Sequence, residues 1–415
     1  MNKYLLFFFL CFTIYVLAQN NTTIRYDLFN EATTFNHSDT ILGVPFITNH
    51  NFTFLLNNSI EEFSEFNKSD LILDFSDFIE NNKSLSFNFF SENNLLYFGF
   101  PKSKSYYSFG YKFYSYFDLN LSNDFLNLFW NGNNQFGDNI AYFRNNTTSL
   151  IQYSSLFFQY SSNIFQKFRF GARISLLHGI NYFNLDKGNF SLQSFANSPT
   201  PYSSLIQTDI FYQSSRANLF GFSNPGLNVN LGIKYILNKF KFSADIYNFG
   251  FIFWHKRPSQ HQSEESYSFD GIDYTMDQVF SDEIDTTIDT LQNIFALNRL
   301  SSNSFFSKTP MRIKFNTIYH FNSSTDFFIN YHAIQSAGSS YSHHSFIGMC
   351  KSIGQNTDFS VAYNINNLSF YNFQFAINRK FKNYLVNINT NNLFSIFNLS
   401  GSNYFNLQAG IYYFF

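Results

Sequence analysis

Long runs in which apolar and polar side chains alternate are the feature that most constrains how this chain can fold. The odd positions from Leu227 to Leu237 are all apolar, whereas the even positions include Asn228, Asn230 and Lys234. Successive side chains of a β-strand point to opposite faces, so this period of two collects the apolar side chains on one face. The pattern predicts an all-β protein.

About 14 segments have this strand-like character, and counts of 12 and 16 both stay open because 84–100 reads either as one strand or as a hairpin. Many of them are about 10–12 residues long, which suits a tilted strand that crosses a bilayer, whereas soluble strands average about 5–6 residues. The segments are 44–56, 84–100, 105–117, 150–161, 168–176, 204–212, 227–237, 240–246, 311–321, 325–334, 357–366, 370–379, 384–392 and 404–415.

Alternation alone does not separate a soluble β-sandwich from a transmembrane barrel. A sandwich would place the charged face in solvent, whereas a barrel would place it in a wet lumen and turn the aromatic face to lipid. Strand length and an aromatic content of 22% favour the barrel. We therefore expect a transmembrane antiparallel β-barrel of about 14 strands with short helical insertions.

The last segment ends in a pattern of its own. Gln408 is followed two residues later by Gly410, and the aromatic residues Tyr413 and Phe415 stand three and five positions after that glycine. This resembles the terminal signal by which outer-membrane barrels are recognised during insertion. The resemblance implies that the barrel-assembly machinery and outer-membrane lipid are partners.

Composition and charge exclude several other classes. Charged residues make up only 13% of the chain, and the formal net charge is −2. Disordered chains are rich in charge and poor in aromatic residues, and nucleic-acid binding needs a basic surface. The sequence therefore predicts neither disorder nor a nucleic-acid partner.

The N-terminus has the pattern of an export signal. A basic start is followed by an apolar run from Tyr4 to Leu17 and then by Ala18, as in a secretory signal peptide. We expect a signal peptide at 1–18, a periplasmic segment or plug at 19–43, and the barrel at 44–415. The mature chain would keep a single cysteine, Cys350, which excludes an intramolecular disulfide.

Three segments lack the alternating pattern. Residues 59–82 read as a surface helix or loop, and 122–132 read as a short helix that begins after Ser122 and ends before Gly132. The long stretch 256–308 carries nine acidic residues and no basic residue between 264 and 289. In a barrel, a loop of this length belongs on the extracellular side.

The sequence offers little catalytic or metal-binding chemistry. His343 and His344 are adjacent, so they would point to opposite faces of a strand, while His320 and His332 fall on lumen-facing positions of neighbouring strands and could approach each other. A histidine pair without a supporting carboxylate or cysteine is more often a polar contact than a metal site. We expect no catalytic residue, no cofactor and no metal.

Cations are frequent on the polar faces of the expected strands, and the predicted lumen residues are Arg169, Arg173, Lys234, Lys241, Arg312 and Lys314. Charge that lines a pore tunes its selectivity, so a basic lumen would attract anions. In the alternative, these side chains pair with the acidic stretch 256–308 folded inward as a plug.

The order of several short motifs resembles a family of outer-membrane β-barrels of unassigned function from Bacteroidota. The motifs are Gly43-Val44-Pro45-Phe46, Phe98-Gly99-Phe100, Tyr106-Tyr107-Ser108-Phe109-Gly110, the run Asp124 to Asn133, Phe170-Gly171-Ala172-Arg173, and the hairpin from Asn224-Pro225-Gly226 to Phe253-Trp254. The resemblance implies an outer-membrane location and a fold distantly like the long-chain fatty-acid transporter. The family is also similar to barrels that accompany the type IX secretion and gliding machinery.

Three functions follow as expectations. The first is a passive channel or transporter for small or hydrophobic molecules, and not an enzyme. The second is a structural or accessory barrel of an envelope secretion or gliding complex, with envelope secretion proteins as partners and a plugged lumen. The third is a secreted soluble β-sandwich adhesin.

Overall fold

The computed structural model describes residues 33–415 with gaps at 63, 68–69, 74, 82, 133, 137–138, 166, 195–203, 220–222, 265, 270–297, 302, 339, 355, 368 and 371. The predicted signal peptide at 1–18 lies outside the described residues, as does 19–32 of the predicted periplasmic segment.

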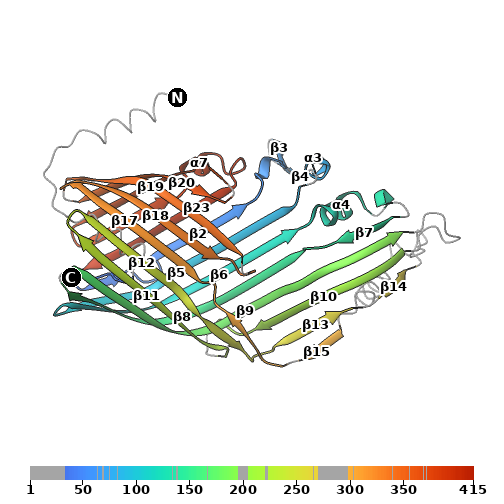
Figure 1. Ribbon diagram of the computed structural model, residues 1–415, viewed down its shortest axis with the longest axis horizontal. Helices are drawn as coiled ribbons and strands as arrows, with labels where there is room; N and C mark the ends of the chain where they lie inside the picture. Colours follow the sequence, from blue (N-terminus) through green and yellow to red (C-terminus); the bar gives the residue numbers. More distant parts are fainter. Residues whose placement is uncertain are drawn as a thin grey trace.

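Fourteen antiparallel strands close into a ring (Figure 1). In order around the ring they are β2 (Asn49–Leu56), β5 (Leu85–Lys102), β6 (Ser105–Leu121), β8 (Thr147–Phe165), β9 (Phe168–Ser194), β11 (Pro225–Leu237), β12 (Phe240–Trp254), β17 (Arg312–Asn322), β18 (Thr325–Gln335), β19 (Tyr341–Ile353), β20 (Thr357–Asn366), β21 (Asn372–Phe381), β22 (Tyr384–Thr390) and β23 (Tyr404–Phe414). The last strand pairs with the first, from Asn49 opposite Gly410 to Leu55 opposite Tyr404. The predicted barrel is confirmed, and the soluble β-sandwich is wrong because the sheet closes on itself.

The barrel wall begins earlier in the chain than expected from the sequence. A short strand, β1 (Ile41–Gly43), pairs with both β5 and β23, three residues before the predicted start at 44. The chain then makes a turn at 44–48 before it continues as β2, with Phe46 in the left-handed region at φ 64°.

Strand β11 shows how the alternating pattern is used. Leu227, Leu231 and Ile233 are 41–46% exposed on the outside of the barrel, whereas Asn228 and Lys234 are at most 4% exposed and point inward. Exposed apolar side chains all around a closed barrel are what contact with lipid requires. The aromatic and aliphatic excess is therefore mainly an outer surface, and the polar set fills the interior.

Tight hairpins join the strands at the end of the barrel where the chain terminates. Ser103, Asn238 and Lys382 each take a positive φ, between 51° and 57°, in the turns after β5, β11 and β21. Such two-residue turns suit the right-handed twist of paired strands. Short turns mark the periplasmic side of outer-membrane barrels, and this end is called the short-turn end below.

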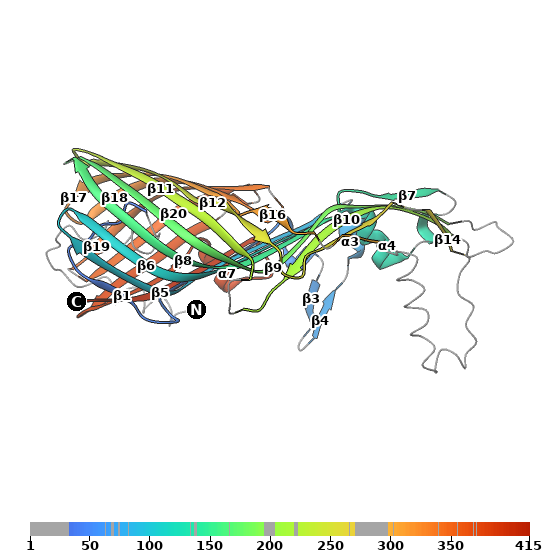
Figure 2. The same cartoon turned by 90° about the horizontal axis from the view of Figure 1, so that it is seen from below.

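At the opposite end the wall continues as a single curved sheet far beyond the ring (Figure 2). Strand β9 is 27 residues long, and its second half pairs with β10 (Ser204–Arg216) instead of β11. The sheet is widened by β7 (Ile140–Phe143), β13 (Ser259–Ser263), β14 (Ser266–Phe269) and β15 (Asn298–Ser301), and β16 (Phe305–Lys308) pairs with β12. This part of the molecule is called the projecting sheet.

The projecting sheet corrects the expectation that 256–308 is a loop without strands. Both ends of that stretch form strands, β13 to β16, because they continue the pairing of β10 and β12. Most of the acidic run at 264–289 lies outside the described residues. The pairing of this run with the lumen cations therefore stays a prediction.

The short helix predicted at 122–132 is confirmed. Helix α4 (Asn123–Asn131) begins after Ser122, whose Oγ accepts a hydrogen bond from the Phe125 amide at 3.3 Å, and Gly132 ends it at φ 75°. The predicted surface segment 59–82 forms a 3-10 turn, η1 (Ile60–Glu62), the hairpin β3 (Ser64–Asn67) and β4 (Asp70–Leu73), and helix α3 (Ser76–Glu80). Helix α7 (Leu393–Phe397) lies between β22 and β23.

None of the described helices is long and apolar enough to cross a membrane.

Candidate functional site

The interior of the barrel is arranged in layers along its axis. At the short-turn end lies a cluster of mainly aromatic residues, in which Phe35 packs edge-on against Tyr106 with ring centroids 5.2 Å apart. The buried members of this layer are Phe35, Ile41, Tyr97, Tyr106, Phe157, Leu385, Tyr412 and Phe414.

The segment that precedes the first strand lies inside the lumen. The Thr33 amide donates to Asp245 Oδ1 at 3.2 Å, and the Thr33 hydroxyl donates to the same oxygen. Gln159 Nε2 donates to the Thr33 carbonyl at 3.1 Å, and the Ser161 hydroxyl donates to the Phe35 carbonyl. Residues 33–35 are thus tied by their backbone to β8 and by Thr33 to β12, and we call them the lumen segment.

Two glycines on the inner wall make room for the lumen segment. A Cβ atom at Gly171 would lie 1.9 Å from the Thr33 carbonyl oxygen, and one at Gly232 would lie 1.9 Å from Thr33 Oγ1. Such distances are far below van der Waals contact. The absence of side chains at these two positions is therefore a condition for the segment to lie where it does.

Next along the axis lies a cluster of charges with more cations than carboxylates. Glu92 accepts from Lys112 Nζ at 3.1 Å and from Arg312 Nη1 at 2.5 Å, and none of the three side chains is more than 9% exposed. Electrostatic interactions connect these groups with the other members. We call this the mid-lumen cluster, and it comprises the cations Lys112, Arg173, Lys234, Arg312 and Lys314 and the carboxylates Glu92 and Asp245.

The structure places four of the six predicted lumen cations in this cluster. Arg173, Lys234 and Arg312 are at most 6% exposed, and Lys314 lies directly opposite Asp245 in the strand register. Arg173 also donates through Nε and Nη2 to Gln159 Oε1, at 2.8 and 2.6 Å.

The other two predicted cations lie nearer the short-turn end. Arg169 donates through Nε to Asn163 Oδ1 at 2.7 Å, and Lys241 is three residues after the hairpin turn at Asn238. They are on the polar faces of their strands but are not members of the mid-lumen cluster.

Glu92 and Lys112 were missed by the sequence analysis. The register of β5 and β6 shifts between Asn94 and Leu96, so the alternation in 84–100 changes phase within the segment. A bulge of this kind moves all later side chains to the other face relative to a regular strand. The only signal in the sequence was one carboxylate and one ammonium in the expected segments 84–100 and 105–117, which carry no other charge.

A second aromatic layer lies on the far side of the cluster. Tyr114 and Tyr153 stack with ring centroids 4.8 Å apart, and Tyr116 stacks against Tyr153 at 6.4 Å. Trp254 is fully buried and donates through Nε1 to Ser307 Oγ at 2.8 Å. These rings pack in one buried cluster with Phe90, Ile151, Leu177, Ile252 and Phe305.

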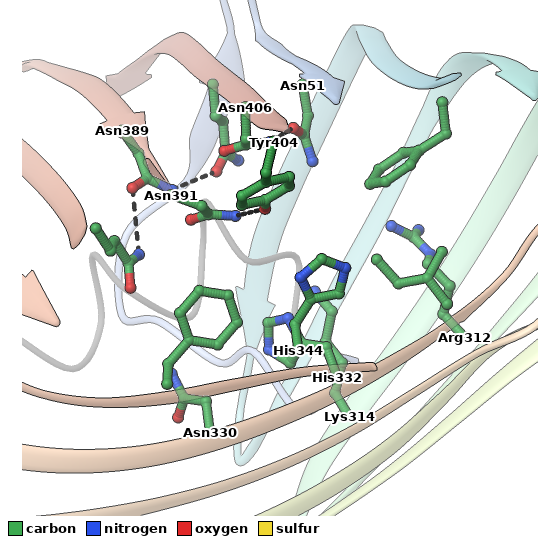
Figure 3. Close-up of a pocket in the computed structure, with 15 residues that line it drawn as sticks. Asn51, Arg312, Lys314, Asn330, His332, His344, Asn389, Asn391, Tyr404 and Asn406 are labelled. Atoms are coloured by element: carbon green, nitrogen blue, oxygen red, sulfur yellow. Dashed lines mark hydrogen bonds between the residues drawn. The ribbon is translucent and has the colours of Figure 1, made fainter. Parts of the chain in front are cut away.

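A polar chamber of about 60 Å³ lies beside the mid-lumen cluster (Figure 3). One side is formed by Arg312 and Lys314 of β17, His332 of β18 and His344 of β19. The remaining lining residues are mainly amides and aromatic rings: Asn51, Phe90, Asn330, Ile334, Phe346, Gln374, Asn389, Asn391, Tyr404, Asn406 and Gln408. Among the described residues, no Asp or Glu lines this chamber.

Amide side chains form a hydrogen-bonded ladder across four strands on the side of the chamber away from the cations. Gln374 Nε2 donates to Asn389 Oδ1 at 3.2 Å, and Asn389 Nδ2 donates to Gln408 Oε1 at 3.2 Å. Gln408 Nε2 continues the ladder to Asn49 Oδ1 at 3.0 Å. This amide ladder runs from β21 through β22 and β23 to β2, so it spans the strand pair that closes the ring.

The predicted approach of His320 to His332 is wrong. In the strand register His320 lies opposite Asp326, to which its Nδ1 is bonded at 2.6 Å, whereas His332 lies opposite Lys314 and His344. The two histidines are separated along the barrel wall by six residue pairs, or about 20 Å at 3.3 Å per residue. The close histidine pair of this lumen is His332 and His344.

His344 and His343 point to opposite faces, as predicted, with His344 2% exposed inside and His343 exposed outside. In the described residues, no three His, Cys, Asp or Glu side chains come together in a way that would hold a metal ion.

The residues of the predicted assembly signal lie on the closing strand. Gln408 points into the lumen as part of the amide ladder, and Gly410 packs against the Thr48 backbone. Tyr413 and Phe415 lie on the outer face, with ring centroids 4.8 Å apart. The role of these four residues in assembly stays a prediction.

A closed antiparallel ring with an apolar outer face and a polar, densely filled interior defines a transmembrane β-barrel. The chain belongs to the Family of unknown function (DUF5723), whose profile matches residues 34–391.

Several solved barrels have a similar overall architecture at very low sequence identity. The toluene transporter TbuX of Ralstonia pickettii is 7% identical, with coverage of 97% of this chain and 98% of that chain and a TM-score of 0.44. A Pseudomonas aeruginosa FadL homologue is 9% identical, with coverage of 92% and 91% and a TM-score of 0.44. The translocator domain of autotransporter NalP from Neisseria meningitidis is 6% identical, with coverage of 91% and 89% and a TM-score of 0.32.

No curated protein matches the sequence. The fold assignment rests on the strand pairing, and what the barrel does has to be argued from its lumen.

Proposed function

We propose that this protein is an outer-membrane barrel that passes small anionic solutes through a gated lumen. The observation that supports this proposal is the mid-lumen cluster, in which five cations surround two carboxylates beside a chamber lined by no described carboxylate. Charged side chains that line a path set the sign of the ions that enter it. A chamber lined by amides and cations suits small polar anions better than the hydrophobic molecules that the sequence analysis also allowed.

The outer membrane is the location that fits this barrel. Its outer face is apolar, its turns are short at the end that carries the C-terminus, and the closing strand ends in the predicted assembly signal. The predicted signal peptide would provide export, and lipid and the barrel-assembly machinery would be the partners.

Passage through this lumen would require a movement of the groups that fill it. Aromatic layers lie on both sides of the mid-lumen cluster, and the lumen segment fills the space near Gly171 and Gly232. The lumen segment is the part best suited to move. It is held to β8 and β12 by hydrogen bonds and packing alone, because neither strand adjoins it in the sequence.

Ion selectivity in planar bilayers tests the proposal. The full chain and a Thr33→Val, Ser161→Ala variant, which removes two of the bonds that hold the lumen segment, would be reconstituted in a KCl gradient. We expect the variant to conduct more than the parent and to prefer chloride over potassium. Thr317→Val, on the outer face of β17, is the matched control and should behave as the parent.

Neutralising the chamber cations should reduce the preference for chloride. Lys314→Gln in the opened variant removes one lumen charge, whereas Arg379→Gln removes an exposed charge outside the lumen and should leave the reversal potential unchanged. A cation-selective current, or silence of every variant, would contradict an anion path.

The residues packed inside the lumen also favour a second candidate, a structural barrel of an envelope complex. A plugged barrel with a large projecting sheet would offer that sheet to other envelope proteins, in keeping with the resemblance to barrels that accompany type IX secretion. The bilayer recordings separate the two candidates, because a structural barrel stays silent when the lumen segment is loosened. Co-purification of envelope proteins from cross-linked cells would then support it.

A further inference from the structure

The two sides of the chamber offer different chemistry. Arg312 and Lys314 present positive charge from β17, and the amide ladder faces them from β21 to β23 (Figure 3). Guanidinium and ammonium groups only donate hydrogen bonds, whereas a side-chain amide both donates and accepts. A ligand that satisfies both sides therefore needs an anionic group at one end and hydroxyl groups at the other.

Unmatched polar atoms on the lining residues show which groups such a ligand must bring. Within the described part of the chain, Gln374 Oε1 and Asn406 Oδ1 have no donor, Arg312 Nε has no acceptor, and neither ring nitrogen of His344 has a partner. All four residues line the chamber and are at most 9% exposed. A buried polar atom left unsatisfied is costly, so these atoms mark where ligand or water atoms are expected.

The size of the chamber suits a ligand of a few atoms. A cavity needs about 10–15 Å³ of probe-occupied volume for each water it holds, so 60 Å³ corresponds to about four to six water positions. A ligand of about four to six non-hydrogen atoms therefore suits that space.

We propose that the chamber binds a short hydroxycarboxylate of the size of glycolate or lactate. The carboxylate would lie against Arg312 and Lys314, and the hydroxyl group would donate to the amide oxygen of Gln374, Oε1. The imidazole of His344 supplies one further donor and one acceptor when it is neutral. This inference rests on the proposed anion path and deepens it by naming the solute class.

Other small solutes lack one of the required groups. Acetate and chloride carry the charge but donate no hydrogen bond to the amide oxygens. Ethylene glycol donates through its hydroxyls but brings no charge for Arg312 and Lys314. Inorganic phosphate matches glycolate in size, and it differs by a higher charge and a tetrahedral shape, so it is the discriminating competitor.

Calorimetric titration of the full chain in lipid nanodiscs, with glycolate, acetate, ethylene glycol and phosphate as probes, tests the inference. We expect glycolate to bind about tenfold more tightly than acetate, which corresponds to one well-formed hydrogen bond to a buried acceptor. Ethylene glycol should show no saturable binding, and phosphate should bind more weakly than glycolate.

Two near-isosteric substitutions separate the two ends of the ligand. Gln374→Met removes the amide and should lower the affinity for glycolate to that of acetate, while acetate binding stays the same. Lys314→Met should weaken both anions. Lys187→Met removes an exposed cation of the projecting sheet, 56% exposed, and should change neither affinity. Heat-dependent migration on a gel shows for each variant that the barrel is closed.

The outcomes distinguish this inference from the function on which it rests. Equal affinity for glycolate and acetate, tighter binding of phosphate, or no effect of Gln374→Met would overturn the hydroxycarboxylate assignment while anion selectivity in bilayers still stands. Absence of binding of every probe together with a silent or cation-selective barrel would overturn both. Binding unchanged in Lys314→Met would show that the ligand lies elsewhere.

Discussion

Glu92 accepts hydrogen bonds from two cations, Lys112 and Arg312, at a depth where water does not screen the charges. The two cations come from β6 and β17, which are not neighbours in the ring, so the carboxylate connects opposite parts of the wall across the lumen. Lys112 also lies 5.6 Å from the ring centre of Phe157, over which the Arg173 guanidinium packs at 4.4 Å. One carboxylate therefore holds together a group of cations that would otherwise repel each other.

Glu92→Gln should lower the free energy of unfolding by about 3–5 kcal/mol, because it leaves two buried cations without their partner. Urea unfolding of the barrel in lipid vesicles measures the change. Asp209→Asn is the matched control, since its bond to Lys187 joins side chains that are 40% and 56% exposed and contributes at most about 1 kcal/mol. Equal effects of the two substitutions would show that the Glu92 bonds are not shielded from water.

At the scale of elements, the lumen segment and the wall depend on each other through Gly171. Gly171→Ala would place a methyl group on the Thr33 carbonyl, and that backbone cannot move aside without leaving Gln159. Gly348 of β19 is crowded by the Val361 backbone in a similar way but lies far from Thr33 in the ring, so Gly348→Ala is the control.

We expect Gly171→Ala to expose the lumen segment. Thr34 is 0% exposed, so a cysteine at this position reports whether the segment stays buried. In a Cys350→Ser background, Thr34→Cys should react with a water-soluble maleimide several times faster in Gly171→Ala than in Gly348→Ala. Equal labelling rates would mean that the segment tolerates a side chain at Gly171.

The same elements show what the sequence predicted and where it fell short. Regular alternation in β11 and β17 gave the correct faces, because one residue in two had to meet lipid. Strand β19 was not among the expected strands. Its outer face has Ile347 and its inner face has Phe346, so both faces include large apolar residues and the alternation is obscured. The segment 204–212 was expected in the ring, but β10 belongs to the projecting sheet, which alternation does not reveal.

The candidate site was only partly predictable for a related reason. Faces could be assigned to Arg173 and Arg312, but which cations share one level of the lumen depends on the stagger between strands. The amide ladder carried no signal, because asparagine is abundant throughout the chain. Its members meet only through the register of β21, β22 and β23 and the closing pair of β23 and β2.

For the whole molecule, the outer aromatic residues at the end of the chain should control how much barrel is assembled. Tyr413→Ala with Phe415→Ala should reduce the amount of closed barrel in outer-membrane fractions, measured by the difference in migration between unboiled and boiled samples. Phe381→Ala removes an exposed aromatic residue at the same end of the barrel and is expected to have little effect. Normal assembly of the double variant would show that the C-terminal pattern is not read.

The pairing of β23 with β2 sets the order of events during folding. The bonds that close the ring join residues more than 350 positions apart, as between Gln408 and Asn49 or Asn406 and Asn51. Contacts of such high sequence separation form slowly, and until the eleven residues of β23 arrive both edges of the growing sheet stay open to pairing with other chains. Newly made chains therefore need protection for as long as synthesis and export last.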